Sequence, residues 1–421
     1  MRLLLVGAFP YPHHQGSQVY FQEQAIALRA AGAEIELLTY ASAASPAEDV
    51  LDRWRALDGF VHHETPPWTT PSSLRSGPSW AKPLADVGLA MTLNDAIASS
   101  MLRSGRYDAI LTHNVEASVV AVLLGMLRPR ARIPLVYCVH TLMENELSTY
   151  SKPLKNKEII PDIERMEEPV GGLRRRLVER AGQFLDRRLA RHADGWIALT
   201  HASARIMRRS SNRPGALIPP AIPDPRHRAE ALDPERVARR HRLEPKGFYL
   251  YSGNLDGYQE LELLAAVSRR RGQAGPKIIL ASHDPAVLNL RLESGSGLET
   301  RHVESQTEML SLLAAARASL VTRRAEGGFP IKLVNSLAVG TPPISFLERE
   351  WGLSDGVNAL IAASLRPAAA YTAAIEKLDH DRAFAAHLGA GARALYEANH
   401  RPVPAAERSL RLIEQICSDS A

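Results

Sequence analysis

Short apolar runs alternate along this chain with segments whose apolar residues are spaced for one face of a helix. The run Arg2–Gly7 predicts a buried strand, and a second strand is predicted within residues 31–40, AGAEIELLTY. Between them lies a predicted helix with apolar positions at Val19, Phe21, Ala25, Ala27 and Leu28. Strand, helix and strand in this order indicate a parallel unit, in which the loop after the first strand lies at the carboxyl edge of the sheet.

The same alternation continues and divides the chain into two parts. Further strands are predicted at Tyr107–Thr112, Pro134–Val139, Gly195–Leu199 and Ala216–Ile218, and then at Phe248–Ser252, Lys277–Ala281 and Ala318–Thr322. The proline-dense stretch Ile218–Pro225 between these groups predicts a linker. We therefore predict an α/β protein of two parallel-sheet domains, residues 1–222 and 223–400, with a C-terminal helix at 401–421 that crosses back to the first domain.

The stretch Glu326–Ala338, EGGFPIKLVNSLA, has the clearest ligand-binding pattern. Its two glycines predict a tight turn between a strand and a helix, where backbone N–H groups and the helix N-terminus favour an anionic ligand. Lys332 falls in the first helical turn and Asn335 about one turn further on the same face. We expect a phosphorylated or hydroxyl-rich ligand. The alternative is a glycine turn that only ends a strand, with Lys332 solvated.

The loop after the first strand, FPYPHHQGSQ, is a second candidate wall of the site. It ends at Gly16, and Ser17 is expected to cap the helix that follows. The loop contains neither G-x-G-x-x-G nor a Walker lysine, which counts against a dehydrogenase or an NTPase. We expect His13 and His14 to be solvated rather than to bind a ligand.

Two predicted strands end in histidine at the same edge of the first sheet. His113 is expected to be structural, whereas His140 begins the polar loop HTLMENELSTY and is expected to contact a ligand. Cys138 lies within an apolar run and is expected to be buried. Because Cys138 and Cys417 are the only cysteines, the sequence predicts neither a disulfide framework nor a cysteine metal motif.

Composition and charge argue against a membrane-spanning protein and against a nucleic-acid-binding protein. The chain has 421 residues, 45% hydrophobic and 23% charged, with a net charge of +5, as is typical of a globular protein. No apolar run reaches the roughly 18–20 residues of a membrane-spanning helix, and no signal peptide is recognised, so we expect a cytoplasmic protein. Nucleic acid binding is not expected, because basic and aromatic residues do not interleave.

The densest basic run, Leu173–His192, predicts an amphipathic helix. Its arginines are expected to be solvated or paired with Glu179 and Asp186. The alternative is peripheral contact with anionic lipid headgroups, which we do not favour because acids interrupt the run and no large aromatic residues anchor it.

Taken in order, the motifs resemble those of retaining glycosyltransferases of family 4, which have the GT-B fold of two Rossmann-like domains facing across a cleft. The resemblance covers nearly the whole chain. The matching segments are the Gly16-Ser17 loop, His140 after its strand, IALTHAS at 197–203, IPPAIPDP at 218–225, YSGNLDGYQELELL at 251–264 and EGGFPIKLVNSLAVGTPPIS at 326–345.

The chain departs from the family pattern at charged positions. Of the two glutamates of the family's E-x7-E motif, the second falls on Asn335 and the first on Gly327, with Glu326 one position early. The arginine and lysine that contact the diphosphate in the family fall on Asn254 and Gln259, which can donate hydrogen bonds but carry no charge. Either Lys332, Arg323 and Arg324 compensate, or catalysis is lost.

The resemblance implies a GDP- or UDP-sugar donor, no cofactor and no metal. It implies that helix N-terminal amides and Lys332 stabilise the leaving phosphates, that Asn335 holds the ribose, and that His140 contacts the transferred sugar or the acceptor, with Glu326 a further catalytic candidate. Donor-binding residues implied are Gly16, Ser17, Thr200, Gly253, Asn254, Gln259, Arg324, Gly328, Phe329, Pro330 and Asn335.

Other functions fit the same resemblance. One is an inactive subunit that binds a sugar nucleotide without turnover, and another is a sugar-nucleotide epimerase of the same fold. Within the transferases, the acceptor is expected to be a glycan or a small molecule, with an oxygen or sulfur nucleophile. The sequence does not choose the base, sugar, acceptor or oligomeric state.

Overall fold

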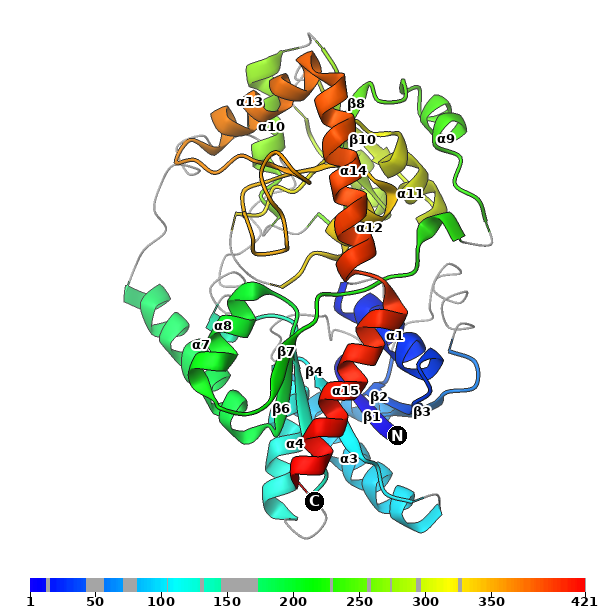
Figure 1. Ribbon diagram of the computed structural model, residues 1–421, viewed down its shortest axis with the longest axis vertical. Coiled ribbons are helices and arrows are strands. Elements are labelled where there is room, and N and C mark those ends of the chain that lie inside the picture. The colour runs from blue at the N-terminus through cyan, green and yellow to red at the C-terminus, as the bar shows by residue number, and fades with distance from the viewer. Residues whose placement is uncertain are drawn as a thin grey trace.

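The computed structural model describes residues 1–12, 16–42, 57–70, 82–103, 105–128, 132–144, 173–227, 230–255, 259–272, 275–292, 297–324 and 328–420. Two sheets divide these residues, one in each half of the chain (Figure 1). The predicted α/β class with two parallel-sheet domains is confirmed.

The first sheet has seven strands in the order β3-β2-β1-β4-β5-β6-β7, and its paired strands are parallel. Its strands β1, β4 and β5 are buried throughout most of their length because helices cover both faces. The bounds are β1 Arg2–Pro10, β2 Glu34–Tyr40, β3 Val61–Glu64, β4 Ala109–His113, β5 Leu135–Val139, β6 Gly195–Ala198 and β7 Gly215–Leu217.

The second sheet has six strands in the order β10-β9-β8-β11-β12-β13, again in parallel. Their bounds are β8 Phe248–Ser252, β9 Lys277–Ser282, β10 Leu298–His302, β11 Ala318–Leu320, β12 Pro343–Ser345 and β13 Leu360–Ile361. Both sheets therefore offer loops at a carboxyl edge, the usual place for ligands in open α/β folds.

Helices flank both sheets. In the first half they are α1 Gly16–Ala30, η1 Pro67–Thr69, α3 Lys82–Arg103, α4 Val115–Leu127, α7 Leu173–His192 and α8 His201–Ser210. In the second they are η3 Pro225–His227, α9 Pro234–Arg240, α10 Glu262–Arg271, η5 Pro285–Asn289, α11 Gln306–Ala315, α12 Ile331–Val339, α13 Pro367–His380, α14 Arg382–Asn399 and α15 Pro402–Ser420. The expectation that Ser17 precedes and caps its helix is wrong, because α1 already begins at Gly16.

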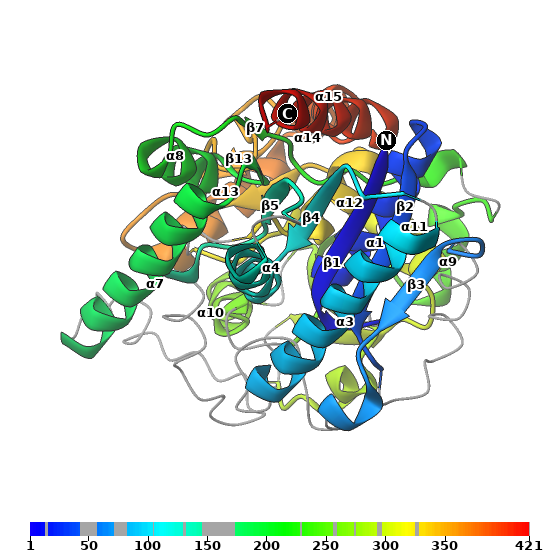
Figure 2. The ribbon, with the colours of Figure 1, turned by 90° about the horizontal axis from the view of Figure 1, so that it is seen from below.

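The two halves share one hydrophobic cluster. It joins Phe21 of α1 to Leu333 and Val334 of α12, and continues through Trp351 and Tyr396. Helix α15 follows α14 back to the first sheet, where it packs against α1, β6 and β7 (Figure 2). The domains therefore meet through buried apolar surface as well as through the linker.

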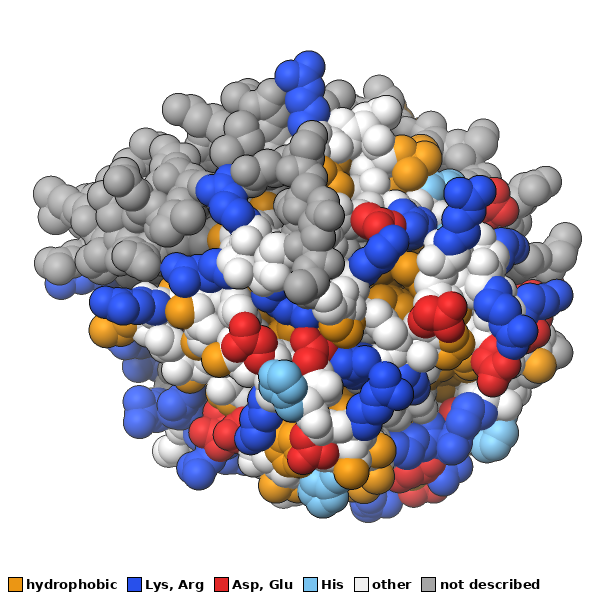
Figure 3. All heavy atoms as spheres, turned by 90° about the horizontal axis from the view of Figure 1, so that it is seen from above, with side chains coloured by type: hydrophobic (Ala, Val, Ile, Leu, Met, Phe, Trp, Pro, Cys, Tyr) orange, Lys and Arg blue, Asp and Glu red, His pale blue; other side chains and the backbone are white. Residues whose placement is uncertain are grey.

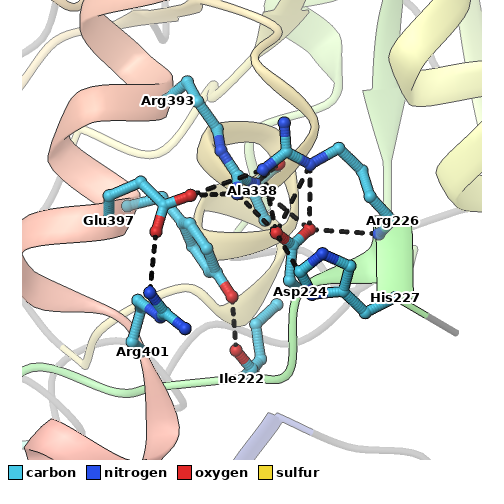
Figure 4. Close-up of polar contacts among 9 residues, drawn as sticks. Ile222, Asp224, Arg226, His227, Ala338, Arg393, Glu397 and Arg401 are labelled. Carbon is cyan, nitrogen blue, oxygen red and sulfur yellow. Dashed lines mark hydrogen bonds and ion pairs between the residues drawn. The ribbon is translucent and has the colours of Figure 1, made fainter.

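The linker is held to α14 by a polar network (Figure 4). The Asp224 carboxylate accepts hydrogen bonds from Arg226 and Arg393, and Arg393 also binds the Ala338 carbonyl oxygen and Glu397. The two arginines hold the pKa of Asp224 far below its usual range, although burial opposes the shift.

Charges of both signs are interspersed on the end of the molecule formed by the second sheet (Figure 3). In the second half of the chain several charges are paired, such as Arg239 with Glu235 and Lys277 with Glu299. No helix of the described residues is both long and apolar enough to cross a membrane.

Candidate functional site

The candidate site forms where the carboxyl end of β8 meets the N-terminus of α12. Gly253 directly follows β8 and has a φ of +144°, a conformation that other residues rarely adopt. A Cβ atom there would lie 3.5 Å from Lys332 Cδ and 3.5 Å from the Tyr251 hydroxyl oxygen. A glycine at this position therefore leaves the Lys332 side chain room to lie along the turn.

Lys332 supplies the cationic group at this point. Its Nζ donates a hydrogen bond of 2.7 Å to Gln259 Oε1 and lies 4.0 Å from the centre of the Tyr251 ring. Burial, with a further contribution from the nearby Arg323 guanidinium, lowers the pKa of Lys332 to about 7. An anion bound here would favour the charged ammonium.

The side-chain amides of Gln259 and Asn254 extend the hydrogen bonding that begins at Lys332. Gln259 is buried, and its Nε2 donates to Asn254 Oδ1 at 2.9 Å. The Tyr251 hydroxyl donates to the Asn254 carbonyl oxygen at 2.8 Å. Lys332, Gln259 and Asn254 thus form one hydrogen-bonded chain around the Gly253 turn.

The predicted arginines take different partners. Arg324 forms an ion pair with Glu260, in which Nε lies 2.7 Å from Oε2. Arg323 donates a longer hydrogen bond of 3.4 Å to the Gly328 carbonyl oxygen. Arg323 therefore links the segment after β11 to the turn before α12, and the charge of Arg324 is partly neutralised.

The turn before α12 approaches the first domain at His140. A Cβ on Gly328 would lie 2.9 Å from the His140 carbonyl oxygen, closer than side chains tolerate. Pro330 is the N-cap of α12, and no side chain caps this helix. The Leu333 N–H donates to the Pro330 carbonyl oxygen at 2.9 Å, so the N–H groups of Ile331 and Lys332 are the first-turn amides that could meet a ligand.

Phe329 is buried, and its side chain belongs to the shared hydrophobic cluster. Its ring lies 5.3 Å from that of His400 and 6.3 Å from that of Trp351, measured between centroids. The side chain thus holds the turn in place, which leaves only the backbone of Phe329 to meet a ligand.

His140 follows β5 and faces His113, the last residue of β4. Its Nε2 lies 2.7 Å from His113 Nδ1, and the Tyr20 ring lies against both imidazoles. Burial lowers the pKa of His140 to about 3, so the imidazole is neutral at physiological pH. His140 can therefore offer a neutral hydrogen bond. His113 is buried, as expected for a structural residue.

Helix α7 holds the segment after His140. The Asp186 carboxylate accepts hydrogen bonds from the backbone N–H groups of Met143, at 3.2 Å, and Glu144, at 3.4 Å. Burial raises the pKa of Asp186 to about 7, while these bonds oppose the shift. Asp186 was expected as one possible partner of the arginines on this helix, but its buried carboxylate faces this backbone.

Three buried side chains near Tyr20 of α1 have ligand atoms close enough together to be considered as a metal site. The ligand atoms of His113, Cys138 and His140 all lie within 4.8 Å of one another, the one such group among the described residues. However, two nitrogens bound to one tetrahedral zinc would be about 3.3 Å apart. The observed 2.7 Å fits a hydrogen bond better. Burial also raises the pKa of Cys138 to about 12, which keeps its thiol protonated.

The remaining predicted site residues have varied surroundings. Gly16 is exposed, and a Cβ there would lie 3.5 Å from Ile331 of α12. Ser17 Oγ donates to Gln18 Oε1. Thr200 is buried as the N-cap of α8, where its hydroxyl accepts from the Ser203 N–H. Asn335 is partly exposed on α12. Glu326, Gly327, His13 and His14 lie outside the described residues.

Three residues around the site, Tyr251, Gly182 and Asp186, were not predicted to belong to it. Tyr251 immediately precedes the recognised Ser252-Gly253 turn, so its position in a strand before a glycine was a usable signal. Gly182 and Asp186 are four residues apart on α7 and face the backbone after His140. No local pattern indicates that contact.

The comparisons with known proteins agree with this architecture. Residues 15–221 match the family described as glycosyl transferase 4-like domain. No curated protein matches the chain in sequence. Among solved structures, sucrose-phosphate synthase from Thermosynechococcus elongatus is 17% identical with a TM-score of 0.71, and 99% of each chain is covered.

Two other similar solved structures are HepE and WaaG. HepE from Anabaena in complex with UDP-glucose is 15% identical with a TM-score of 0.65, covering 99% of this chain and 100% of its own. WaaG, a glycosyltransferase involved in lipopolysaccharide biosynthesis, is 14% identical with a TM-score of 0.62. The match covers 96% of this chain and 98% of the WaaG chain.

The similar solved structures show that the chain has the GT-B fold. The match of residues 15–221 to the glycosyl transferase 4-like domain agrees with the resemblance to glycosyltransferases noted in the sequence.

Proposed function

We propose that this protein transfers a sugar from a UDP- or GDP-sugar to a glycan or small-molecule acceptor with retention of configuration and without a metal. The observation that carries the proposal is the position of Lys332, beside the Gly253 turn and in the first turn of α12. The Gly253 turn, the N-terminus of α12 and one lysine come together there, a combination that suits a leaving diphosphate.

Lys332 takes over the charge that the Gly253 loop lacks. The family resemblance places a lysine at position 259, where this chain has glutamine. Lys332 Nζ lies 2.7 Å from the Gln259 side chain, so the ammonium reaches the same place from α12. A pKa of about 7 in the free protein lets the bound diphosphate complete the protonation of Lys332.

The other side chains have supporting roles in this proposal. Asn335, on α12 and partly exposed, accepts hydrogen bonds from the ribose hydroxyls. The backbone of Gly328 and Phe329 binds the sugar, and neutral His140 contacts the sugar or the acceptor, with an oxygen or sulfur nucleophile. UDP is the favoured nucleotide, because the similar HepE was solved with UDP and with UDP-glucose.

An inactive sugar-nucleotide-binding subunit is the second candidate. The observation in its favour is the ion pair of Arg324 with Glu260, which leaves Lys332 with less cationic support. Such a subunit would bind the donor without turnover in the presence of acceptors, whereas the transferase releases the nucleotide.

Isothermal titration calorimetry with UDP, GDP, ADP and TDP tests the donor site. We expect micromolar binding of one nucleotide, weakened about tenfold or more in Lys332→Ala and weakened less in Asn335→Ala. Lys377→Ala is the matched control, because Lys377 also lies on an aromatic ring, 4.5 Å from the centre of Phe384, but on α13. Failure of all four nucleotides to bind would overturn the proposal.

A further inference from the structure

His140 is joined to a second buried histidine that the proposed function does not use. His113 ends β4 and pairs in register with Cys138 of the neighbouring β5, so His140, two residues further on, lies on the same face. The imidazole centroids are 4.9 Å apart and the ring planes meet at 73°. With Nε2 of His140 engaged at 2.7 Å, only its Nδ1 is left for a ligand.

The surroundings of His113 decide where the shared proton lies. His113 Nε2 is fully buried and has no hydrogen-bond partner in the described part of the chain. The Phe21 ring beside it, 4.9 Å away between centroids, offers no lone pair. A buried N–H without an acceptor is rarer than a buried acceptor without a donor. The proton is therefore better placed on His113 Nδ1, which donates it to His140 Nε2.

This arrangement fixes the tautomer of His140. Since its Nε2 accepts a hydrogen bond, the neutral imidazole must carry its proton on Nδ1. We propose that His113 is a positioning residue that holds His140 as an Nδ1–H donor toward the transferred sugar. The sugar role rests on the proposed function, but the tautomer does not.

Nuclear magnetic resonance of the ¹⁵N-histidine-labelled protein reads the tautomer directly. The His140 signals are identified by their loss in His140→Gln. We expect a protonated Nδ1 and an unprotonated Nε2, and the reverse assignment would overturn the inference. Stoichiometric zinc in the purified protein, lost on His113→Asn, would also overturn it, because the three side chains would then be a metal site.

Variants of His113 test its effect on the donor. The side-chain amide nitrogen of asparagine lies near the place of histidine Nδ1, so His113→Asn keeps the donor whereas His113→Leu removes it. We expect Kd for UDP-glucose to rise about tenfold in His113→Leu and less than threefold in His113→Asn, with Kd for UDP unchanged in both. Equal weakening of UDP-glucose in both variants would contradict the positioning role.

The two hypotheses fail in different ways. If the wild-type protein binds neither UDP nor UDP-glucose, a UDP-sugar is not the donor, while the His140 tautomer still tests the histidine pair. If UDP binds and His113→Leu leaves the affinity for UDP-glucose unchanged, the donor site stands and the inference from the histidine pair fails.

Discussion

The protonation state of Lys332 depends on whether an anion occupies the candidate site. Burial and Arg323 lower its pKa to about 7, so near neutral pH about half of the free molecules carry the ammonium. The negative charge of a bound diphosphate would raise this pKa again. Binding above pH 7 therefore takes up a proton, and the affinity must depend on pH.

We predict that the affinity for UDP-glucose decreases as the pH rises from 7 to 9. The decrease approaches about tenfold per pH unit until the pH reaches the pKa of the complex. UDP-glucose suits the experiment because its diphosphate diester keeps a fixed charge in this range. Calorimetry at several pH values measures the effect, and Lys332→Arg should abolish it, since arginine stays charged. A constant affinity in the wild-type protein would refute the prediction.

For single residues, the sequence was a better guide to which residues belong to the candidate site than to their hydrogen-bond partners. Lys332, Gly253 and Gln259 were all candidates, and the structure brings them together, although their function stays a prediction. Their hydrogen bond could not be predicted, because Lys332 and Gln259 are 73 positions apart. Asp186 was expected only as a possible partner for the arginines of its helix, because burial of a helical residue by a loop leaves no periodic signal in the sequence.

Among the elements, α7 determines the course of the chain after His140. Asp186 binds the backbone at Met143 and Glu144, and Gly182, one helical turn earlier, lets that backbone come close. The strands were easier to predict than this contact. Buried parallel strands are nearly continuous apolar runs, whereas contact between a helix and a loop depends on the fold of both.

A methyl group on α7 should disturb this contact. In Gly182→Ala the new Cβ would lie 2.4 Å from the Glu144 nitrogen and 2.6 Å from its Cα, so the backbone must move. We expect a loss of about 1–3 kcal/mol, measured by urea unfolding. Gly125→Ala on α4 is the control, because no atom lies within 4 Å of its new Cβ. That variant should gain up to about 1 kcal/mol, and equal stability of both variants would refute the contact.

For the whole molecule, the fold class was predictable and the mutual arrangement of the domains was not. Repeated strand and helix patterns with a proline-rich linker indicate two parallel-sheet domains. The shared hydrophobic cluster joins Phe21 of the first half to Leu333 of the second. An apolar residue in the sequence is expected to be buried, but the sequence does not show whether it packs against its own domain or the other one. No role was predicted for Glu350, although this residue of the second half accepts a hydrogen bond from the first half.

Glu350 connects the second domain to the first through the N-terminus of α8. It is 6% exposed, and its two carboxylate oxygens lie 3.1 and 3.0 Å from the backbone nitrogen of Ala202, which donates to them. The positive end of the helix dipole adds to this attraction. Because Glu350 lies between β12 and β13, this contact couples the position of α8 to the second sheet.

Removing this carboxylate should loosen the domains without unfolding either. We predict that Glu350→Ala lowers the free energy of unfolding by about 1–3 kcal/mol and increases the radius of gyration in small-angle X-ray scattering. Asp381→Ala is the matched control, because the Asp381 carboxylate accepts from the Phe384 N–H at 2.7 Å at the start of α14, within the second half. It should cost about 1 kcal/mol and leave the radius unchanged. If both variants change the radius equally, the effect belongs to general destabilisation and not to the contact between the domains.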